Sequence, residues 1–444
     1  MNQDVLTYLC RSYYLKQHPV LQEKLAYKEN YCRALAYFVR KYYTGSDMFA
    51  FSMLEHYCRS LLGVDYVPTV FTPLDESEIR PAIGKVAALK IKRFKLFTYR
   101  FVFMTDCLFL CAFSDEDTAK KILHELKALF NTRYHRRLEV LFSALYHGSP
   151  LEKGMDNAAE LVSFWIREQK FFELPIKTVL VTATMSAGKS TLINAIVGKR
   201  LMRTAQEACT GHICRLYNKP FEDGENAIKT TQLIFDADAD TLLASENIGD
   251  CQIASGFRTF LDVQNRVCIV DTPGVNSAIN RSHGITAKEA LRDCQYDLLV
   301  YVLNANQLGT DDEISYLKYI VANTPKEKVV FVLNKTDTFK KTEDSIEESI
   351  QGVKDDLVQL GYESPVVFPI SAYFALLIKL RLSNIQLDED EGDELAHYIK
   401  KYSKPEYDLT RYYDASYENA SDDILAQMSI RCGLYGLENI LFGE

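Results

Sequence analysis

No stretch of this sequence approaches the run of about 18 apolar residues that a helix needs to cross a bilayer. The longest candidate, Phe101 to Phe113, is too short and contains Asp106. The amino terminus begins Met1-Asn2-Gln3-Asp4, without the basic start and apolar core of a secretory signal. We therefore expect a soluble protein of the cytoplasm.

The sequence also lacks cysteines at the spacing of metal ligands and lacks an excess of positive charge. These two absences argue against a metal site built from cysteines and against general binding of nucleic acids. The 11 cysteines are scattered, and the closest pair, Cys107 and Cys111, has no matching Cys/His pair to complete a metal site. Isolated buried thiols in a reducing compartment are the favoured interpretation. The formal net charge of −9 argues against general affinity for nucleic acids.

The chain is long enough for two or three separate cores. It has 444 residues, of which 47% are hydrophobic, and a typical domain has about 150 residues. A turn at residues 148–150 marks the main boundary. We expect a mainly helical α+β domain of unknown role at 1–150, a connecting helix at 151–171 and a second domain at 172–444. Helices are predicted at 21–43, 115–130, 133–146 and 155–171, a break at 63–81, and two strands within 94–113 that join around Thr105-Asp106.

The segment Thr182 to Thr191, TATMSAGKST, has the pattern of a phosphate-binding loop. It lies between an apolar strand-like segment and a helix-like segment, which is the context that this chemistry requires. Backbone N–H groups converge on a polyphosphate, Lys189 supplies a positive charge to its outer phosphates, and the Ser190 hydroxyl ligates Mg²⁺. The usual first glycine is Ala183, so the chain must enter the loop without a positive φ. The predicted nucleotide-binding residues here are Met185, Ser186, Ala187, Gly188, Lys189, Ser190 and Thr191.

Two further polar motifs follow segments with the pattern of buried strands. Residues 267–270 lead into Asp271-Thr272-Pro273-Gly274, and residues 328–333 lead into Asn334-Lys335-Thr336-Asp337. Because open parallel sheets bind ligands at the carboxyl ends of their strands, we expect both motifs beside the phosphate loop. Asp271 is placed to hold Mg²⁺ through water, and the Gly274 N–H is placed to bond the γ-phosphate.

The second of these motifs predicts the base of the nucleotide. The Asp337 carboxylate can accept hydrogen bonds from the N1–H and the exocyclic amine of guanine, and adenine presents no matching donor pair. Asn334 and Lys335 join Asp337 in this selection, and the backbone of Ser371-Ala372 can cap the guanine carbonyl oxygen. We therefore expect GTP and GDP as ligands. The expected fold is a P-loop NTPase G domain whose mostly parallel sheet is covered by helices on both faces.

This ordered set of motifs resembles the G domain of regulatory GTPases, and its details look most like the dynamin superfamily, in particular its bacterial members. The resemblance covers about residues 172–444 and rests on Ser186 to Ser190, Cys209-Thr210-Gly211, Asp271 to Ser277 and Tyr296 to Asn306. It implies that Thr210 closes over the Mg²⁺ held by Ser190 and Asp271, and that Thr210 positions the attacking water. The expected catalytic residues of this Mg²⁺-dependent GTPase are Lys189, Thr210 and Ser186.

The resemblance also implies a homodimer through G domains and contact with an anionic membrane surface. A basic and aromatic stretch at 85–100 would suit such a surface, but an ordinary strand with a charged outer face is the preferred interpretation. The acidic loop expected at 386–394 is interpreted as solvated rather than as a Ca²⁺ site. Residues 433–441 resemble the closing helix of the G domain, so no long stalk is expected after it.

Two other functions remain open from the sequence. One is a monomeric GTP-dependent switch that acts on a protein or ribosomal partner. The other is a GTP-binding scaffold that has lost hydrolysis. This alternative stays open because Ala183 and Met185 depart from the residues usual at these positions of the loop. Turnover that rises with protein concentration would favour the dynamin-like enzyme, slow and constant turnover the switch, and no turnover the scaffold.

Overall fold

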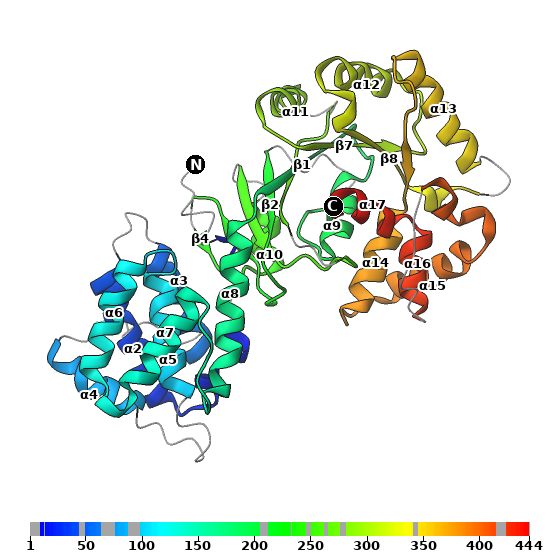
Figure 1. The fold of residues 1–444 in the computed structure, drawn as a ribbon. Helices are drawn as coiled ribbons and strands as arrows, with labels where there is room; N and C mark the ends of the chain where they lie inside the picture. Colours follow the sequence, from blue (N-terminus) through cyan, green and yellow to red (C-terminus); the bar gives the residue numbers. More distant parts are fainter. Residues whose placement is uncertain are drawn as a thin grey trace. The chain divides into compact units, whose positions relative to one another are not determined.

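The chain divides into two compact units (Figure 1). The helical unit comprises Met1–Glu173 with Leu233–Phe235, and the sheet unit comprises Leu174–Gln232 with Asp236–Glu444. None of the helices in the described residues has the length and apolar content that a membrane crossing requires. The computed structural model describes residues 9–12, 14–43, 49–63, 76–87, 98–204, 212–231, 233–245, 250–261, 265–275, 281–340, 345–413 and 423–443.

The helical unit confirms the helices predicted at 21–43, 115–130, 133–146 and 155–171, to within about one turn at each end. The Asp115 carboxylate starts α6 by accepting hydrogen bonds from the N–H groups of Asp117 and Thr118. Gly148 ends α7 with a φ of 64°. The helices of this unit are α2 (Leu25–Tyr42), α3 (Phe49–Leu62), α4 (Glu76–Ala87), α5 (Thr98–Cys111), α6 (Glu116–Leu129), α7 (His135–His147) and α8 (Ala159–Glu173).

The two strands predicted within residues 94–113 are wrong, because residues 98–111 form helix α5. Residues 94–97 lie outside the described part of the chain. Helix α5 is buried around most of its circumference, so it has no polar stripe, and its aromatic and branched residues resemble a strand. Asp106 was expected in a turn but lies inside this helix, where it accepts hydrogen bonds from His18 Nε2 (3.0 Å) and from the Tyr31 hydroxyl.

The break expected at residues 63–81 is wrong at its carboxyl end. Helix α4 begins at Glu76 and contains Pro81. The helix therefore tolerates the loss of the backbone hydrogen bond that proline cannot donate. In the basic and aromatic stretch at 85–100, residues 88–97 lie outside the described residues. Arg100 is 4% exposed, and its Cζ atom lies 3.9 Å from the centre of the Tyr134 ring. Arg100 therefore packs inside the helical unit and does not face a membrane.

The sheet unit contains the mostly parallel sheet that was predicted. Its strand order is β4-β3-β5-β2-β6-β1-β7-β8-β9. Neighbours from β6 to β9 in this order pair in parallel, whereas β2 is antiparallel to β6 and β3 is antiparallel to β5. The strands are β1 (Ile176–Ala183), β2 (Cys214–Asn218), β3 (Ala227–Lys229), β4 (Leu233–Ile234), β5 (Cys251–Ser255), β6 (Arg266–Asp271), β7 (Leu298–Asn304), β8 (Val329–Asn334) and β9 (Val367–Pro369).

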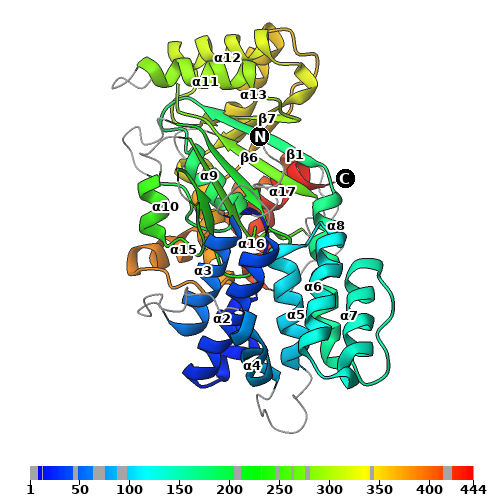
Figure 2. The ribbon, with the colours of Figure 1, turned by 90° about the vertical axis from the view of Figure 1, so that its left-hand side faces the viewer.

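Helices cover both faces of this sheet, as predicted. Figures 1 and 2 show α11 (Arg281–Asp293), α12 (Asp311–Asn323) and α13 (Ile346–Gln359) on one face. On the other face lie α9 (Lys189–Val197), α14 (Ala372–Leu382) and α17 (Leu434–Phe442), and α17 is the predicted closing helix. A buried ion pair between Lys379 and Glu438 joins α14 to α17. The other helices are α10 (Ala239–Ser245), α15 (Glu389–Tyr402) and α16 (Ile424–Arg431).

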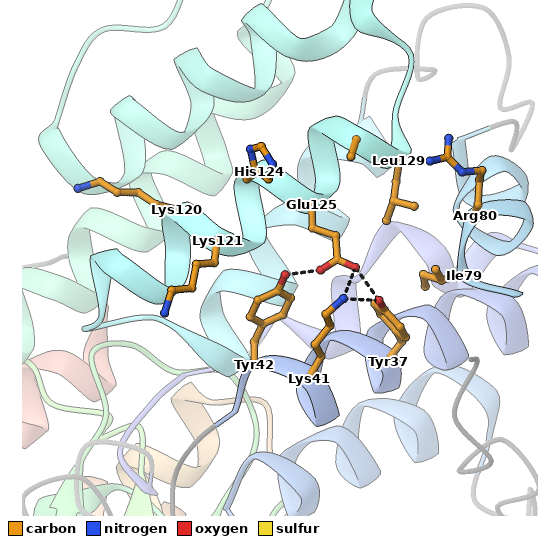
Figure 3. Close-up of a pocket in the computed structure, with 11 residues that line it drawn as sticks. Tyr37, Lys41, Tyr42, Ile79, Arg80, Lys120, Lys121, His124, Glu125 and Leu129 are labelled. Carbon is orange, nitrogen blue, oxygen red and sulfur yellow. Dashed lines mark hydrogen bonds and ion pairs between the residues drawn. The ribbon is translucent and has the colours of Figure 1, made fainter. Parts of the chain in front are cut away.

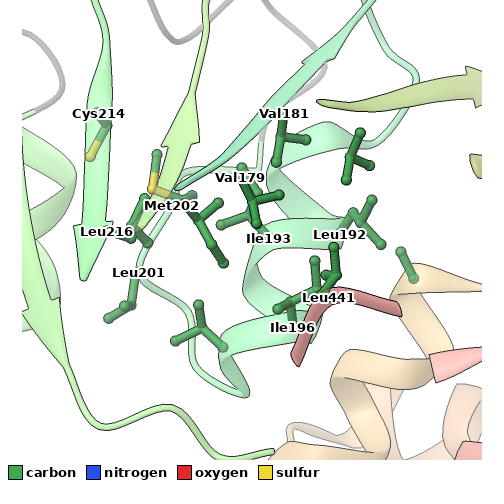
Figure 4. Packing of buried hydrophobic residues seen from close by; sticks show 14 of the residues in the cluster. Val179, Val181, Leu192, Ile193, Ile196, Leu201, Met202, Cys214, Leu216 and Leu441 are labelled. Atoms are coloured by element: carbon green, nitrogen blue, oxygen red, sulfur yellow. The ribbon is translucent and has the colours of Figure 1, made fainter. Parts of the chain in front are cut away.

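A continuous apolar core fixes α9 against the central strands. Figure 4 shows Val179 and Val181 of β1 facing Leu192 and Ile193 of α9, with Leu441 of α17 beside them. Each of these side chains is at most 1% exposed. Because the core holds both β1 and α9, the loop that joins them starts and ends at fixed points.

The acidic loop expected at 386–394 is wrong over most of its length, because α15 begins at Glu389. The Asp388 side chain accepts a hydrogen bond from the Glu391 N–H (2.8 Å), and the Glu391 side chain accepts one from the Asp388 N–H (3.2 Å). This is a capping box, and acidic residues in a first turn also favour the positive end of the helix dipole. The charge run is therefore the start of a helix.

Candidate functional site

The phosphate loop occupies residues 184–188, between the end of β1 and the start of α9. Ala183 stays in β1 and has no positive φ, as its identity predicted. The left-handed positions are Ser186, with a φ of 60°, and Gly188, with a φ of 84°. A Cβ atom on Gly188 would lie 2.4 Å from Nδ2 of Asn334, so only glycine fits there. Positive φ at Ser186 costs on the order of 1 kcal/mol, and such strain is concentrated at functional sites.

Lys189 and Asp271 form an ion pair at the carboxyl ends of β1 and β6. Lys189 is 7% exposed and Asp271 is fully buried. Burial raises the pKa of Asp271, and the positive charge of Lys189 opposes that rise. The second carboxylate oxygen, Oδ2, is buried and has no hydrogen-bond partner among the described residues.

These groups fit a divalent cation beside bound phosphates. A buried carboxylate oxygen without a partner needs a compensating charge or donor, and Mg²⁺ prefers oxygen ligands. Ser190 follows Lys189 in the first turn of α9 and is half-buried. Asp271 and Ser190 are suited by their oxygen donors to hold Mg²⁺, and their role as metal ligands stays a prediction.

The segment that follows β6 runs along the phosphate loop. Thr184 and Val275 form a parallel bridge. A Cβ atom on Gly274 would lie 3.6 Å from Cγ of Met185, so these two residues are in contact range. The Thr272 hydroxyl donates a hydrogen bond to a backbone carbonyl of β1 at 3.0 Å. The Gly274 backbone is consequently held next to the loop that would carry the phosphates.

Asn334, at the end of β8, ties the phosphate loop to the connection between β9 and α14. Its Nδ2 atom donates to the Ala187 carbonyl at 2.9 Å, and its Oδ1 atom accepts from the Ala372 N–H at 3.0 Å. The side chain is 2% exposed, so both of its ends are committed to backbone groups. Lys335 has a φ of 68°, and its Cε atom lies 3.8 Å from where a Cβ on Gly188 would be. Asn334 therefore joins the phosphate loop to the start of α14.

Asp337 is oriented by the residue that begins α14. The Ser371 hydroxyl donates to Oδ1 of Asp337 at 2.6 Å, and Ser371 Oγ accepts from the Phe374 N–H at 3.4 Å. A carboxylate can accept about four hydrogen bonds, so Asp337 keeps acceptor capacity for a ligand. Asp337 is half-buried, so part of the residue is exposed to solvent.

Two residues of this site were not predicted from the sequence. Lys401 of α15 donates from Nζ to the carbonyls of Asp337 and Phe339, each at 2.6 Å. Asn304, at the end of β7, donates from Nδ2 to the Ser186 carbonyl at 3.3 Å. The sequence could have indicated Asn304, because it is the first polar residue after an apolar strand. Asp271 and Asn334 were predicted from the same pattern.

Thr210 lies outside the described residues, so its place at the metal stays a prediction. The other predicted residues fall on the β1–α9 connection, the segment after β6, the end of β8 and the start of α14. Strands β6, β1, β7, β8 and β9 are consecutive neighbours in the sheet. Their carboxyl ends therefore bring all these residues to one edge.

Residues 179–336 match the model of the Dynamin family. This segment contains the phosphate loop, the pair of Lys189 and Asp271, and β8 up to Thr336. Residues 179–336 of the sheet unit therefore resemble the Dynamin family. The resemblance stated from the motifs is thereby confirmed.

Two proteins with similar sequences come from a plant and a bacterium. A probable transmembrane GTPase, FZO-like and chloroplastic, of Arabidopsis thaliana is 30% identical over 51% of this chain and 22% of its own length. Dynamin-like protein 1 of Campylobacter jejuni is 25% identical over 43% of this chain and 31% of its own length. A structure of an oligomerised bacterial dynamin pair aligns over 86% of this chain and 58% of its own, with a TM-score of 0.37 and 17% identity. The chain thus spans less than a third of either curated relative.

Lys401 gives the sheet unit a brace that can be tested. In Lys401→Met the aliphatic stem is kept, but the carbonyls of Asp337 and Phe339 lose a charged donor. We expect the affinity for GDP to fall at least about tenfold, because hydrogen bonds to charged groups are worth about 1.5–3 kcal/mol and about 1.4 kcal/mol is a factor of ten. The nucleotide should dissociate faster, as measured by stopped-flow release of a fluorescent GDP analogue.

The matched control for this change is Lys400→Met. Lys400 precedes Lys401 on α15 and is exposed. Its replacement by Met therefore removes the same charge without removing the contacts to Asp337 and Phe339. Equal dissociation rates in the two variants would contradict a bracing role for Lys401.

Proposed function

We propose that this chain binds GTP together with Mg²⁺ and hydrolyses it to GDP and phosphate. The observation that carries this proposal is the pair of contacts made by Asn334, which join the phosphate loop to the Ser371-Ala372 segment beside Asp337. A phosphate-binding loop and a carboxylate for the base are thus parts of one connected structure. The proposed organisation is a helical domain at 1–150, a connecting helix at 151–171 and the GTPase domain at 172–444.

In this proposal Lys189 moves its charge from Asp271 to the nucleotide. The Lys189 ammonium neutralises the outer phosphates, and backbone N–H groups of the loop and of α9 bind phosphate oxygens. Asp271 then loses its cationic partner and is left to hold Mg²⁺ with Ser190. When bound, Mg²⁺ would supply positive charge where the phosphate oxygens gain negative charge.

Guanine would be selected by the Asp337 carboxylate. Ser371 orients Oδ1, and the remaining acceptor positions of the carboxylate would face the N1–H and the exocyclic amine of the base. The Ser371-Ala372 backbone would cap the guanine carbonyl oxygen. Adenine would leave the carboxylate facing its ring nitrogen without a donor pair, which is disfavoured.

Thr210→Ala is expected to lower kcat by at least about tenfold, because about 1.4 kcal/mol of transition-state stabilisation is lost with the group that positions water. GDP affinity should change little, since GDP lacks the γ-phosphate that closes the switch. Single-turnover hydrolysis of GTP measures this effect.

Thr231→Ala is the matched control for Thr210→Ala, because Thr231 is exposed and lies outside the motifs. Hydrolysis at the parent rate in a folded Thr210→Ala protein would move the catalytic role elsewhere. Thr272 has its hydroxyl engaged by a carbonyl of β1, whereas Ser186 is exposed in the loop. Ser186 would then be the next residue to replace.

The proposal includes self-association through the sheet unit and peripheral binding to an anionic membrane from the cytoplasm. The similarity of residues 179–336 to the Dynamin family supports both. The rate of GTP hydrolysis should rise with protein concentration and rise further with anionic liposomes. A slow rate that is constant in both conditions would favour a monomeric switch, and binding without turnover would favour a scaffold.

A further inference from the structure

Two buried thiols of the sheet unit lie in direct contact. Cys214 is the first residue of β2, and Cys251 is the first residue of β5. These strands pair in parallel, with Cys214 and Cys251 as register partners. The Cys251 thiol donates to the Cys214 sulfur at 2.9 Å, and each residue is 2% exposed. The spacing of cysteines in the sequence could not indicate this pair, because its members are 37 residues apart.

The backbone places the two sulfurs where a disulfide requires them. Neighbouring strands lie about 4.7–4.9 Å apart, and disulfides join residues whose Cα atoms are about 4.4–6.8 Å apart. Register partners point to the same face of a sheet, and Figure 4 shows Cys214 on the face of β2 that carries Leu216. The two sulfurs need to close from 2.9 Å to about 2.05 Å, so a shift of less than about 1 Å is sufficient.

The pair lies at the edge of the sheet that carries the predicted site residues. Strand β2 runs antiparallel to β6, so Cys214 at the start of β2 is the register partner of Asp271 at the end of β6. In the sequence, Thr210 precedes Cys214 by four residues. The proposed GTPase function uses neither thiol. A bond between them would therefore add a covalent restraint beside the nucleotide site without removing one of its side chains.

We propose that Cys214 and Cys251 form a reversible disulfide when the protein reacts with a hydroperoxide. Hydrogen peroxide oxidises one thiol to a sulfenic acid, and its O–O bond breaks to release one water. The second sulfur then attacks the sulfenic sulfur, the S–S bond forms, the S–O bond breaks, and a second water leaves. The two thiols lose two electrons and two protons in total. A dithiol reductant reverses the bond by thiol–disulfide exchange.

Burial makes this reaction selective and slow. Thiols are less reactive when they are buried, so local openings that admit a small oxidant should set the rate. Once one of the two sulfurs is a sulfenic acid, the other is already in contact with it. Closure within the pair should therefore outrun reaction with an external thiol.

The bond would restrain a segment that is otherwise held by non-covalent contacts. It closes a loop from residue 214 to residue 251, and this loop contains β3 and α10. Cross-linking the ends of a loop restricts its unfolded forms. Local opening that separates the start of β2 from the start of β5 would no longer occur while the bond is present.

The first experiment maps disulfides in the full chain. The reduced protein is treated with hydrogen peroxide without denaturant, free thiols are blocked with N-ethylmaleimide, and unreduced peptides are identified by mass spectrometry. A peptide that joins Cys214 to Cys251 should appear, and dithiothreitol should remove it. The Cys251→Ala protein should not form this bridge.

Cys268→Ala is the matched control for Cys251→Ala. Cys268 is also a buried cysteine, in the neighbouring strand β6. Its register partner on β2 is Tyr217, so its replacement leaves the contact between Cys214 and Cys251 intact. The Cys268→Ala protein should form the Cys214–Cys251 bridge to the same extent as the parent.

Amide hydrogen exchange measures the restraint. In the oxidised parent, residues 214–218 and 251–255 should exchange at least about threefold more slowly than in the reduced parent, because the opening that separates β2 from β5 is blocked. The same peroxide treatment should not slow exchange in the Cys251→Ala protein. It should slow exchange in the Cys268→Ala protein as in the parent.

Helix α6 of the helical unit provides an internal reference for exchange, because it contains no cysteine. Its Glu125 side chain accepts hydrogen bonds from the Tyr37 hydroxyl (2.6 Å) and from Nζ of Lys41 (3.1 Å), as Figure 3 shows. No thiol takes part in these contacts. Exchange in α6 should therefore be equal before and after oxidation.

Three results would overturn the proposal. The first is the absence of a Cys214–Cys251 peptide from the folded, peroxide-treated protein. The second is a bridge that forms only in urea or that joins only other cysteines, such as Cys32 and Cys58, whose thiols are hydrogen-bonded. The third is unchanged exchange in a protein that carries the Cys214–Cys251 bridge. None of these measurements uses a nucleotide, so their failure is separate from a failure of the GTPase assignment.

Discussion

Lys189→Ala is expected to remove most of the binding of GTP and GDP. The variant loses the cationic side chain of the first residue of α9, where the phosphates would lie. A charge-assisted contact to phosphate that is made in a buried setting is worth about 3 kcal/mol, so affinity should fall about a hundredfold or more. Equilibrium binding of fluorescent GDP with Mg²⁺ measures the loss.

The same substitution leaves a buried charge without its partner. Asp271 is fully buried and its pKa is already raised by burial, so loss of Lys189 should raise that pKa further. A folded-state pKa above the unfolded value means that the folded protein binds more protons, and stability falls as pH rises through that interval. The nucleotide-free variant should therefore melt at a lower temperature at neutral pH than at mildly acidic pH.

Lys318→Ala is the matched control, because Lys318 lies exposed on α12. It should change neither nucleotide affinity nor the pH dependence of melting. Unchanged affinity in a folded Lys189→Ala protein would falsify the assignment of the phosphate loop.

The sheet and the edge where the predicted site residues lie could be predicted, because short segments of the sequence indicate both. Strands covered on both faces, such as β7 and β8, are continuous apolar runs, and the first polar residue after each run marks the carboxyl end. Asp271, Asn334 and Ser371 were found in this way. Parallel pairing then brings these ends together without further information.

Elements without such a signal were not predicted correctly. Helix α5 is buried on nearly all sides, so the period that identifies a helix is missing from its sequence. Asp106 depends on His18 and Tyr31, which are 88 and 75 residues away in the chain. No local pattern indicates that a buried aspartate will find such distant donors.

The bracing residues of the site show the same limit. Lys401 lies 64 residues after the Asp337 carbonyl that it contacts, in a helix whose start was taken for an acidic loop. Asn334 was expected to help to select the base, and its motif gives no sign that both ends of its side chain would bond to backbone groups. Motifs indicate which residues meet a ligand, and only the fold shows which residues hold the motifs in place.

Asp337→Asn is expected to change which base the protein prefers. The amide cannot accept both guanine donors, but its N–H₂ can donate to the additional carbonyl of xanthine. The structure favours this exchange, because Ser371 can still donate to the remaining side-chain oxygen and keep the residue oriented. GTP affinity should fall about a hundredfold or more, and XTP should become the tighter ligand.

Competition between GTP, XTP and ATP for a fluorescent GDP analogue measures this exchange. Asp355→Asn provides the control, since Asp355 is exposed on α13 and its replacement should leave the order of affinities unchanged. The base-reading role of Asp337 predicts more than weaker binding, because a merely damaged site would lose GTP and XTP alike. Displacement by ATP as effective as that by GTP in the unmodified protein would show that this carboxylate does not read the base.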